Sequence, residues 1–193
     1  MRDANGKSLF AVSDADLKSG RSDAQYDDTK FLSQEGEWFL AGVLDGLPDG
    51  MYYAEVLILH LTASNTSSHA YGQSSLPPTQ HATHNVCLQL VPTINGYKRL
   101  VGGEAFWAPN AVTYGYDSRA ASIRIISPPS VPPAATRMEI RVPGADMNPY
   151  FALSAIFALG LRGIEKKMPL PGPPVSQLTL EDKKAGKVSR RRS

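Results

Sequence analysis

The stretch RMEIRVPGADMNPY, residues Arg137 to Tyr150, combines a strand-like alternation with a helix start. Successive side chains of a β-strand point to opposite faces, so Arg137, Glu139 and Arg141 share one face and the apolar residues share the other. Two explanations are open for the charged face. It is either a solvated ladder of ion pairs on an exposed antiparallel strand or the charged wall of a site.

The end of this stretch predicts a helix. Asn148 is a favourable N-cap, and Pro149 is a favourable first helical residue. The segment that follows, YFALSAIFALGLRGIEKK, is apolar nearly all round. This pattern predicts a buried helix that ends near Lys166 and Lys167.

Further elements are predicted upstream. The stretch RDANGKSLF has the turn formers of a loop or hairpin tip. Apolar residues then recur at helical spacing and predict an amphipathic helix over Thr29–Leu44. Three short pieces have the pattern of strands, and the Pro-rich SPPSVPPAATR must connect the second to the third. The pieces are Val112–Tyr116, Ser122–Ile126 and Met138–Val142.

Composition restricts the class of protein. The chain has 193 residues, 42% of them hydrophobic, which is enough for a sizeable core. The net charge is +2 and the signs are mixed apart from a basic C-terminal end, so nothing favours nucleic-acid or membrane binding. The single cysteine, Cys87, excludes an internal disulfide framework and is compatible with a reducing compartment. We expect a cytoplasmic protein.

The segment from Gly50 to Gln89 differs from its neighbours, because it contains no Lys or Arg and a single acid. It predicts a disordered loop, although forty such residues inside a compact domain are unusual. His81, His84 and Cys87 suggest zinc, but no fourth ligand follows at a recognised spacing. A genuine insertion and translation of a retained intron are both open explanations of the segment.

The sequence also contains three blocks, PTINGYKRLVGGEAFWAP, SRAASIRI and RMEIRVPGADMNPY, in this order. Together they resemble the C-terminal part of the catalytic domain of the glutamine synthetase family. The resemblance covers residues 1–49 and 90 to about 175. It implies an α+β fold in which an antiparallel sheet is backed by helices. We expect a partial catalytic domain over 1–175, interrupted by 50–89, and a polar basic tail over 176–193.

The resemblance also implies roles for five arginines. Arg99 and Arg141 would bind the carboxylates of glutamate. Arg119 and Arg124 would contact the nucleotide and the transferred phosphate, and act in catalysis. Arg137 would lie near the nucleotide. A guanidinium suits these tasks, because it pairs with carboxylate or phosphate through two parallel hydrogen bonds and stays charged.

Two glutamates complete the implied site. Glu139 would be a ligand of Mg²⁺ or Mn²⁺, and the two flanking arginines would keep it ionised. Glu104 is the nearest candidate for the flap residue that meets ammonium, although the family's flap glutamate directly precedes Ala-Pro and Trp107 stands there in this chain. No GxxxxGK[ST] loop occurs, so the phosphates of ATP would not be held in the P-loop manner.

The implied reaction is the ATP-dependent ligation of ammonia to the γ-carboxylate of glutamate through γ-glutamyl phosphate. Met1 and Arg2 stand about where the family's chain has just left a His-x-His-x-Ser-Leu strand. We therefore expect a C-terminal fragment that is inactive alone, from a protein that forms stacked homo-oligomeric rings when full length. Two alternatives are a non-catalytic assembly or regulatory relative and a γ-glutamyl ligase that uses an organic amine.

Overall fold

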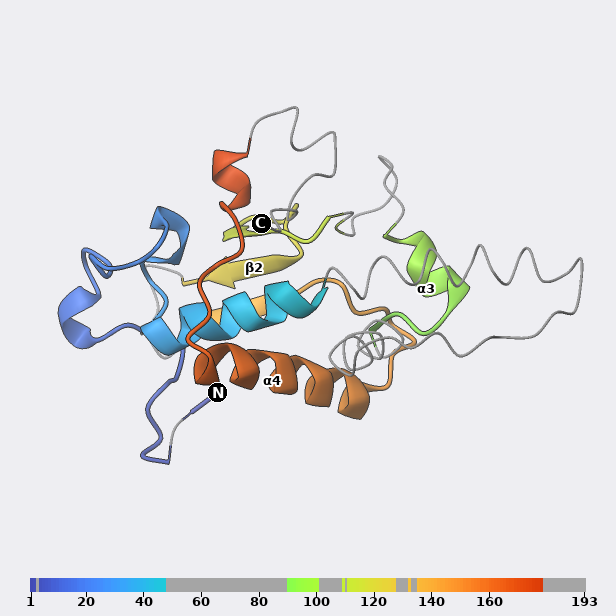
Figure 1. Cartoon of the computed structure of the whole chain (residues 1–193), viewed down its shortest axis with the longest axis horizontal. Coiled ribbons are helices and arrows are strands. Elements are labelled where there is room, and N and C mark those ends of the chain that lie inside the picture. Colours follow the sequence, from blue (N-terminus) through green and yellow to red (C-terminus); the bar gives the residue numbers. More distant parts are fainter. Residues whose placement is uncertain are drawn as a thin grey trace, which may run out of the picture.

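The computed structural model describes residues 1–2, 4–47, 90–100, 109, 111–127, 132 and 135–178. Its longest elements are a helix over residues 34–47 and helix α4 (Pro149–Glu165). A short helix α3 (Ile94–Lys98) and three strands lie between them in the chain. The strands are β1 (Tyr114–Tyr116), β2 (Ile123–Ile126) and β3 (Arg137–Ile140). Figure 1 shows helix 34–47 between the sheet and α4.

The three strands form one sheet in the order β1-β2-β3. The pair β2–β3 is antiparallel, as expected, whereas β1 and β2 run parallel, so the sheet is mixed rather than wholly antiparallel. Side-chain alternation identifies the two faces of a strand but not its direction. Here residues 117–122 return the chain alongside β1, and the parallel pairing continues where the amide of Asp117 donates to the carbonyl of Ile125 over 2.9 Å. The α+β class is confirmed.

Helix 34–47 begins five residues later than predicted. Its N-cap is Ser33, whose hydroxyl accepts a hydrogen bond from the amide of Gly36 over 2.9 Å. Residues Asp27–Thr29 form a separate 3-10 turn, and the hydroxyl of Thr29 donates to the carbonyl of Tyr26 over 3.0 Å. The apolar spacing that predicted the helix therefore began before the helix itself, because it includes Leu32, which is fully buried between the 3-10 turn and the helix.

Helix α4 begins and ends as predicted. The side chain of Asn148 accepts a hydrogen bond from the amide of Tyr150 over 3.0 Å, Pro149 opens the helix, and Lys166 is its C-cap. The prediction that the helix is buried is wrong for one of its faces. One side contacts helix 34–47, but on the opposite side Tyr150 is 80% exposed. Apolar residues therefore occur on both sides of α4. Other described residues pack against only one of these sides.

The two helices pack unusually closely at a pair of glycines. A methyl group added at Gly42 would lie 2.7 Å from the Cα atom of Gly163, and one added at Gly163 would lie 2.8 Å from the Cα atom of Gly42. Gly160 is likewise covered by the ring of Phe39. Distances below about 3 Å leave no space for a Cβ atom, so only glycine permits this backbone contact.

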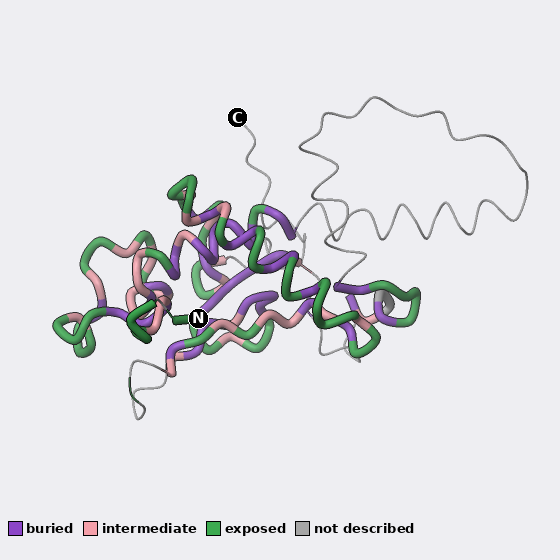
Figure 2. The backbone as a smooth tube through the Cα atoms, turned by 90° about the horizontal axis from the view of Figure 1, so that it is seen from below, coloured by how far each residue is buried: buried purple, intermediate pink, exposed green. Residues whose placement is uncertain are grey.

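The core continues from these helices to the sheet. The buried tube segments gather in the interior in Figure 2, and Leu40, Ile123 and Ile125 have no exposed surface. The C-terminal segment closes the sheet at β1, where the hydroxyl of Tyr114 donates to the carbonyl of Gly172 over 2.8 Å. Among the described residues, no helix has both the length and the apolar character required to span a bilayer.

The RDANGKSLF stretch was predicted to be a loop or hairpin tip, and the pairing on either side of it agrees with a hairpin tip. Arg2 and Ser8 make an isolated antiparallel bridge, and Gly6 has a φ of 79°, which favours glycine. The Pro-rich segment connects β2 to β3 as predicted, since these strands end at Ile126 and begin at Arg137. The segment 50–89 and the three residues proposed there for zinc lie outside the described residues.

The contact between Gly42 and Gly163 leads to the first prediction. Replacing Gly42 with Ala raises intrinsic helix propensity by about 1 kcal/mol, but the added methyl group must push two backbones apart. We expect the free energy of unfolding to fall by about 1 to 3 kcal/mol. Urea denaturation followed by circular dichroism measures this change.

A matched control is Gly172→Ala, since a methyl group there would have no atom within 4 Å. This variant should unfold at nearly the same urea concentration as the wild type. A Gly42→Ala variant as stable as the wild type would show that the helices can separate without cost, and would contradict the importance of the contact.

Candidate functional site

The charged face of β3 forms an ion-pair ladder with β2. The strand register places Arg124 directly opposite Glu139. One carboxylate oxygen of Glu139 accepts a hydrogen bond from Arg124 Nη1 over 3.2 Å, and the other lies 3.3 Å from Arg141 Nε. Glu139 thus bridges two arginines, one from each side. The alternation in the sequence correctly predicted that Glu139 and Arg141 share a face.

Arg124 has a second carboxylate partner, Asp117. The Nε of Arg124 donates to Asp117 Oδ1 over 3.0 Å, and its Nη2 contacts the same oxygen. Asp117 follows β1 directly and has a left-handed φ of 48°, a conformation that Asp tolerates better than most residues. With this backbone conformation, the carboxylate of Asp117 lies against Arg124 of β2.

The electrostatic effect of the contact is mutual. The hydrogen bond from Arg124 holds the pKa of Asp117 below its ordinary value, and the charge of the guanidinium adds to the effect. The same hydrogen bond raises the pKa of Arg124. Both groups are therefore charged throughout the neutral range.

The arginines of the ladder are more deeply placed than its acids. The side chains of Arg124 and Arg141 are 19% and 16% exposed, whereas those of Glu139 and Asp117 are 44% and 65% exposed. The carboxylates therefore hold the two guanidinium groups in fixed orientations beneath a rim that solvent can reach. Fixed donors of this kind are suited to binding an anion, because little side-chain freedom remains to be lost.

Arg99 contacts the chain just beyond Arg141. Its Nη1 donates to the carbonyl of Pro143 over 3.2 Å. The amide of Gly144 donates to the carbonyl of Leu90 over 2.8 Å, so the segment that carries Arg99 is attached to the chain leaving β3. The structure thus brings the neighbourhoods of the two predicted glutamate-binding arginines together.

Arg119 and Arg137 lie at the periphery. Both are exposed, Arg119 in the turn between β1 and β2 and Arg137 at the start of β3. The charge of Arg119 contributes to the lowered pKa of Asp117, which places Arg119 near the ladder. Arg137 donates to the carbonyl of Ala135 over 3.2 Å. Glu104, the predicted flap residue, lies outside the described residues.

The surroundings of the predicted metal ligand, Glu139, are cationic. Both of its oxygens already face guanidinium groups. Within the described part of the chain, no cluster of three or more His, Cys, Asp or Glu side chains could hold a metal ion. A divalent cation prefers several oxygen ligands, so these residues alone do not form a site for Mg²⁺.

Sequence reasoning missed Asp117. The strand before it has only three residues, so the sequence shows no alternation of polar and apolar side chains that would assign Asp117 to a face. Its contact with Arg124 also depends on the parallel pairing of β1 with β2. A weak signal was present, because an Asp directly after a predicted strand can adopt a left-handed turn. The sequence alone did not indicate that this turn faces Arg124.

The second prediction concerns the titration of Asp117. Carboxyl carbon NMR of the folded chain should give a midpoint below that of an ordinary Asp, because Arg124 favours the ionised form. In Arg124→Gln the midpoint should rise toward the ordinary value. The stabilising contribution of the contact is present above the pKa of Asp117 in the unfolded chain, and it disappears as pH falls through the lower folded value.

Arg137→Gln is the matched control, since Arg137 is an exposed arginine of β3 that donates to a backbone carbonyl. It should leave the midpoint of Asp117 unchanged. Equal midpoints in the wild type and Arg124→Gln would contradict the proposed cause of the shift.

Comparison with known proteins now defines the family. A sequence model described as "Glutamine synthetase, catalytic domain" matches residues 75–189, which is more than half of the chain. The match begins inside the segment 50–89 and ends inside the proposed tail. The division into domain, insertion and tail stays a prediction.

Individual relatives agree with this match. The chain is 44% identical over 99 residues to type-1 glutamine synthetase 2 of Dictyostelium discoideum, covering 51% of this chain and 18% of that protein. It is 39% identical over 92 residues to a gamma-glutamylethanolamide synthetase of Streptomyces coelicolor, covering 48% and 19%. It is 44% identical over 78 residues to a glutamate–isopropylamine ligase of a Pseudomonas species, covering 40% and 16%. The matched part is thus less than a fifth of each of these relatives, and the chain belongs to the glutamine synthetase catalytic-domain family.

Proposed function

We propose that this chain supplies part of the active site of an ATP-dependent ligase that joins ammonia to the γ-carboxylate of glutamate. The observation that carries the proposal is the ladder of Arg124, Glu139 and Arg141, which lies within the segment matched by the family. Ligation of this kind must bring a carboxylate and a triphosphate together against their mutual repulsion. Partly buried guanidinium groups that carboxylates hold in place meet that requirement.

The reaction would proceed in two transfers. An oxygen of the γ-carboxylate attacks the γ-phosphorus of ATP, ADP leaves, and γ-glutamyl phosphate is formed. Ammonia then attacks the carbonyl carbon of this intermediate, phosphate leaves, and a proton is lost from the nitrogen. Both steps place negative charge on oxygens that arginine donors can stabilise.

The proposed roles follow the positions of the arginines. Arg99 and Arg141 lie toward one end of the ladder and would bind the carboxylates of glutamate. Arg124, with Arg119 in the adjoining turn, would contact the nucleotide and the transferred phosphate. Arg137 would lie at the nucleotide end.

The binding of divalent metal ions is also a proposal, and the described residues supply only one of the ligands it needs. Divalent ions of the type that Glu139 would bind neutralise phosphate charge when present. Both oxygens of Glu139 pair with arginines here, so further carboxylates would have to come from outside the described residues. Glu104 is proposed to meet ammonium on the sequence resemblance alone.

A second candidate function is the ligation of an organic amine to glutamate. It is favoured by the names of two relatives, a gamma-glutamylethanolamide synthetase and a glutamate–isopropylamine ligase. These proteins match this chain about as well as the glutamine synthetases do. Product formation with ammonium, ethanolamine and isopropylamine, compared at equal concentrations, distinguishes the two candidates.

The third prediction tests the arginines in a chimera. Residues 90–178 of this chain would replace the corresponding segment of the Dictyostelium relative, and steady-state kinetics would be measured with glutamate. We expect Arg99→Ala and Arg141→Ala each to weaken use of glutamate by roughly 10- to 100-fold, since each removes a charge-assisted contact worth about 1.5 to 3 kcal/mol.

Lysine at either position should restore little activity, because an ammonium cannot donate two parallel hydrogen bonds to one carboxylate. The matched control is Lys166→Ala, an exposed cation at the C-cap of α4, which should leave the kinetics unchanged. Unchanged dependence on glutamate in both arginine variants would overturn their assignment.

The fourth prediction concerns residues 1–193 alone. We expect no turnover above background when phosphate release is measured with ATP, Mg²⁺, glutamate and ammonium, because Glu139 is the single carboxylate proposed to bind metal. The chain with Glu139→Ala serves as the control. Turnover of about 1 per second or faster that is lost in the control would show that this chain is a complete catalyst.

A further inference from the structure

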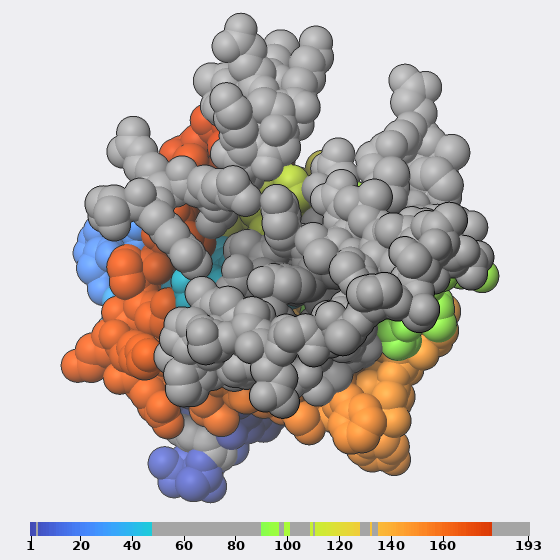
Figure 3. All heavy atoms as spheres, turned by 45° about the vertical axis from the view of Figure 1, so that its right-hand side comes forward, coloured from blue at the N-terminus to red at the C-terminus, as the bar shows by residue number. Residues whose placement is uncertain are grey.

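Asp117 joins the ladder from the turn that follows β1. Its backbone amide donates to the carbonyl of Ile125, so the residue is attached to β2 immediately beside Arg124. Its carboxylate accepts two hydrogen bonds from Arg124, both on Oδ1, and the bond from Nε measures 3.0 Å. In the space-filling view, yellow-green atoms of the segment 111–127 reach the surface (Figure 3). The contact therefore lies at the accessible rim of the ladder.

Two carboxylates divide the donors of Arg124 between them. A guanidinium has five N–H groups. Nε and one N–H of Nη2 bind Asp117, and one N–H of Nη1 binds Glu139 over 3.2 Å. One N–H on each Nη nitrogen is left without a partner in the described part of the chain. Two such donors on the outer nitrogens of one planar group match two oxygens of a phosphoryl group.

The contact with the neighbouring strand does not by itself select this face of Arg124. Glu139 holds the guanidinium at a single nitrogen, Nη1. A group held at one point keeps rotational freedom, which an anion would have to remove on binding. Asp117 occupies the edge formed by Nε and Nη2, so the two carboxylates together fix the guanidinium at all three of its nitrogens.

The contact does not act by attracting phosphate, because Asp117 is itself an anion. By charge alone, removal of this carboxylate would strengthen the binding of phosphate to the neighbouring arginines. Loss of the orientation of Arg124 would weaken the same interaction. The two effects have opposite signs, so substitutions at Asp117 separate them.

We propose that Asp117 is a positioning residue, which orients Arg124 so that its two remaining N–H groups bind the phosphoryl group that is transferred. This inference rests on the proposed ligase function and adds to it the residue that selects the binding face of Arg124. Because Arg124 is assigned to phosphate and not to glutamate, a fault in its orientation should lower kcat rather than raise the KM for glutamate.

The first test requires no ligase activity. Nitrogen-15 NMR of the full chain follows the Nε–H signal of Arg124, which Arg124→Lys identifies by its loss. Asp117→Gly keeps the left-handed turn but removes the carboxylate, so this hydrogen should exchange with water about 10-fold faster than in the wild type. Asp117→Asn should exchange nearly as slowly as the wild type, since its amide oxygen accepts the same bonds. Equal exchange in Asp117→Gly and the wild type would overturn the proposal.

The second test uses steady-state kinetics of the chimera that carries residues 90–178. Asp117→Gly should lower kcat by roughly 10- to 100-fold and change the KM for glutamate by less than about twofold. Asp117→Asn should retain most of kcat, because it preserves the orientation of Arg124 without the charge.

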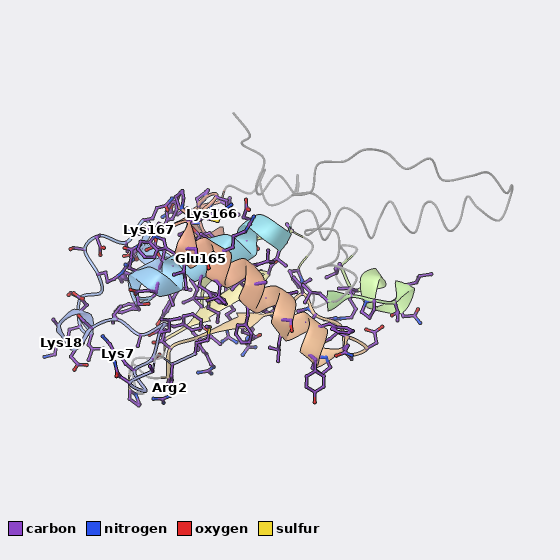
Figure 4. All side chains as sticks on the ribbon, turned by 60° about the horizontal axis from the view of Figure 1, so that its bottom comes forward. Arg2, Lys7, Lys18, Glu165, Lys166 and Lys167 are labelled. Carbon is purple, nitrogen blue, oxygen red and sulfur yellow. The ribbon has the colours of Figure 1, made fainter. Side chains whose placement is uncertain are left out.

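The matched control is Glu165→Gln, which removes an exposed carboxylate at the C-terminal end of α4 and should leave both constants unchanged (Figure 4). An unchanged or higher kcat in Asp117→Gly would show that the carboxylate acts through its charge alone or not at all, and would overturn the proposal. A chimera that is inactive before any substitution would instead contradict the ligase function, and the exchange measurement would still decide whether Asp117 orients Arg124.

Discussion

The close contact between Gly42 and Gly163 determines how the rest of the fold is arranged. Because no Cβ atom separates the two backbones, helix 34–47 and α4 approach closely enough for Phe39 to cover Gly160. Helix 34–47 is then enclosed between α4 and the sheet, with Leu40 fully buried. The sheet that carries Arg124 and Glu139 packs on helix 34–47. The contact between the two glycines therefore positions the helix that supports the charged ladder.

The parts of the fold that depend on local chemistry could be predicted from the sequence. The cap and the first residue of α4 were identified correctly, because Asn148 and Pro149 act on the adjacent backbone. Partners distant in the chain were harder to predict. The sequence did not indicate that β1 pairs parallel to β2, or which side of α4 would face helix 34–47, since the helix is apolar on both.

The candidate site divides in the same way. Alternation along β3 placed Glu139 and Arg141 on one face, which is a property of the strand alone. The pairing of Arg124 with Asp117 depends on the turn after β1 and on strand order, and neither follows from spacing. The resemblance to the family supplied the roles of these residues. The structure supplies their contacts. It also shows that the arginine side chains are less exposed than the carboxylates, which neither the spacing of the sequence nor the resemblance predicted.

The hydrogen bond from Arg99 to the carbonyl of Pro143 has a consequence for substitutions nearby. Pro143 is two residues beyond Arg141, so the bond connects the side chain of one proposed glutamate-binding residue to the backbone that carries the other. A substitution that moves Pro143 would therefore remove a hydrogen-bond partner of Arg99 as well as shift the backbone next to Arg141.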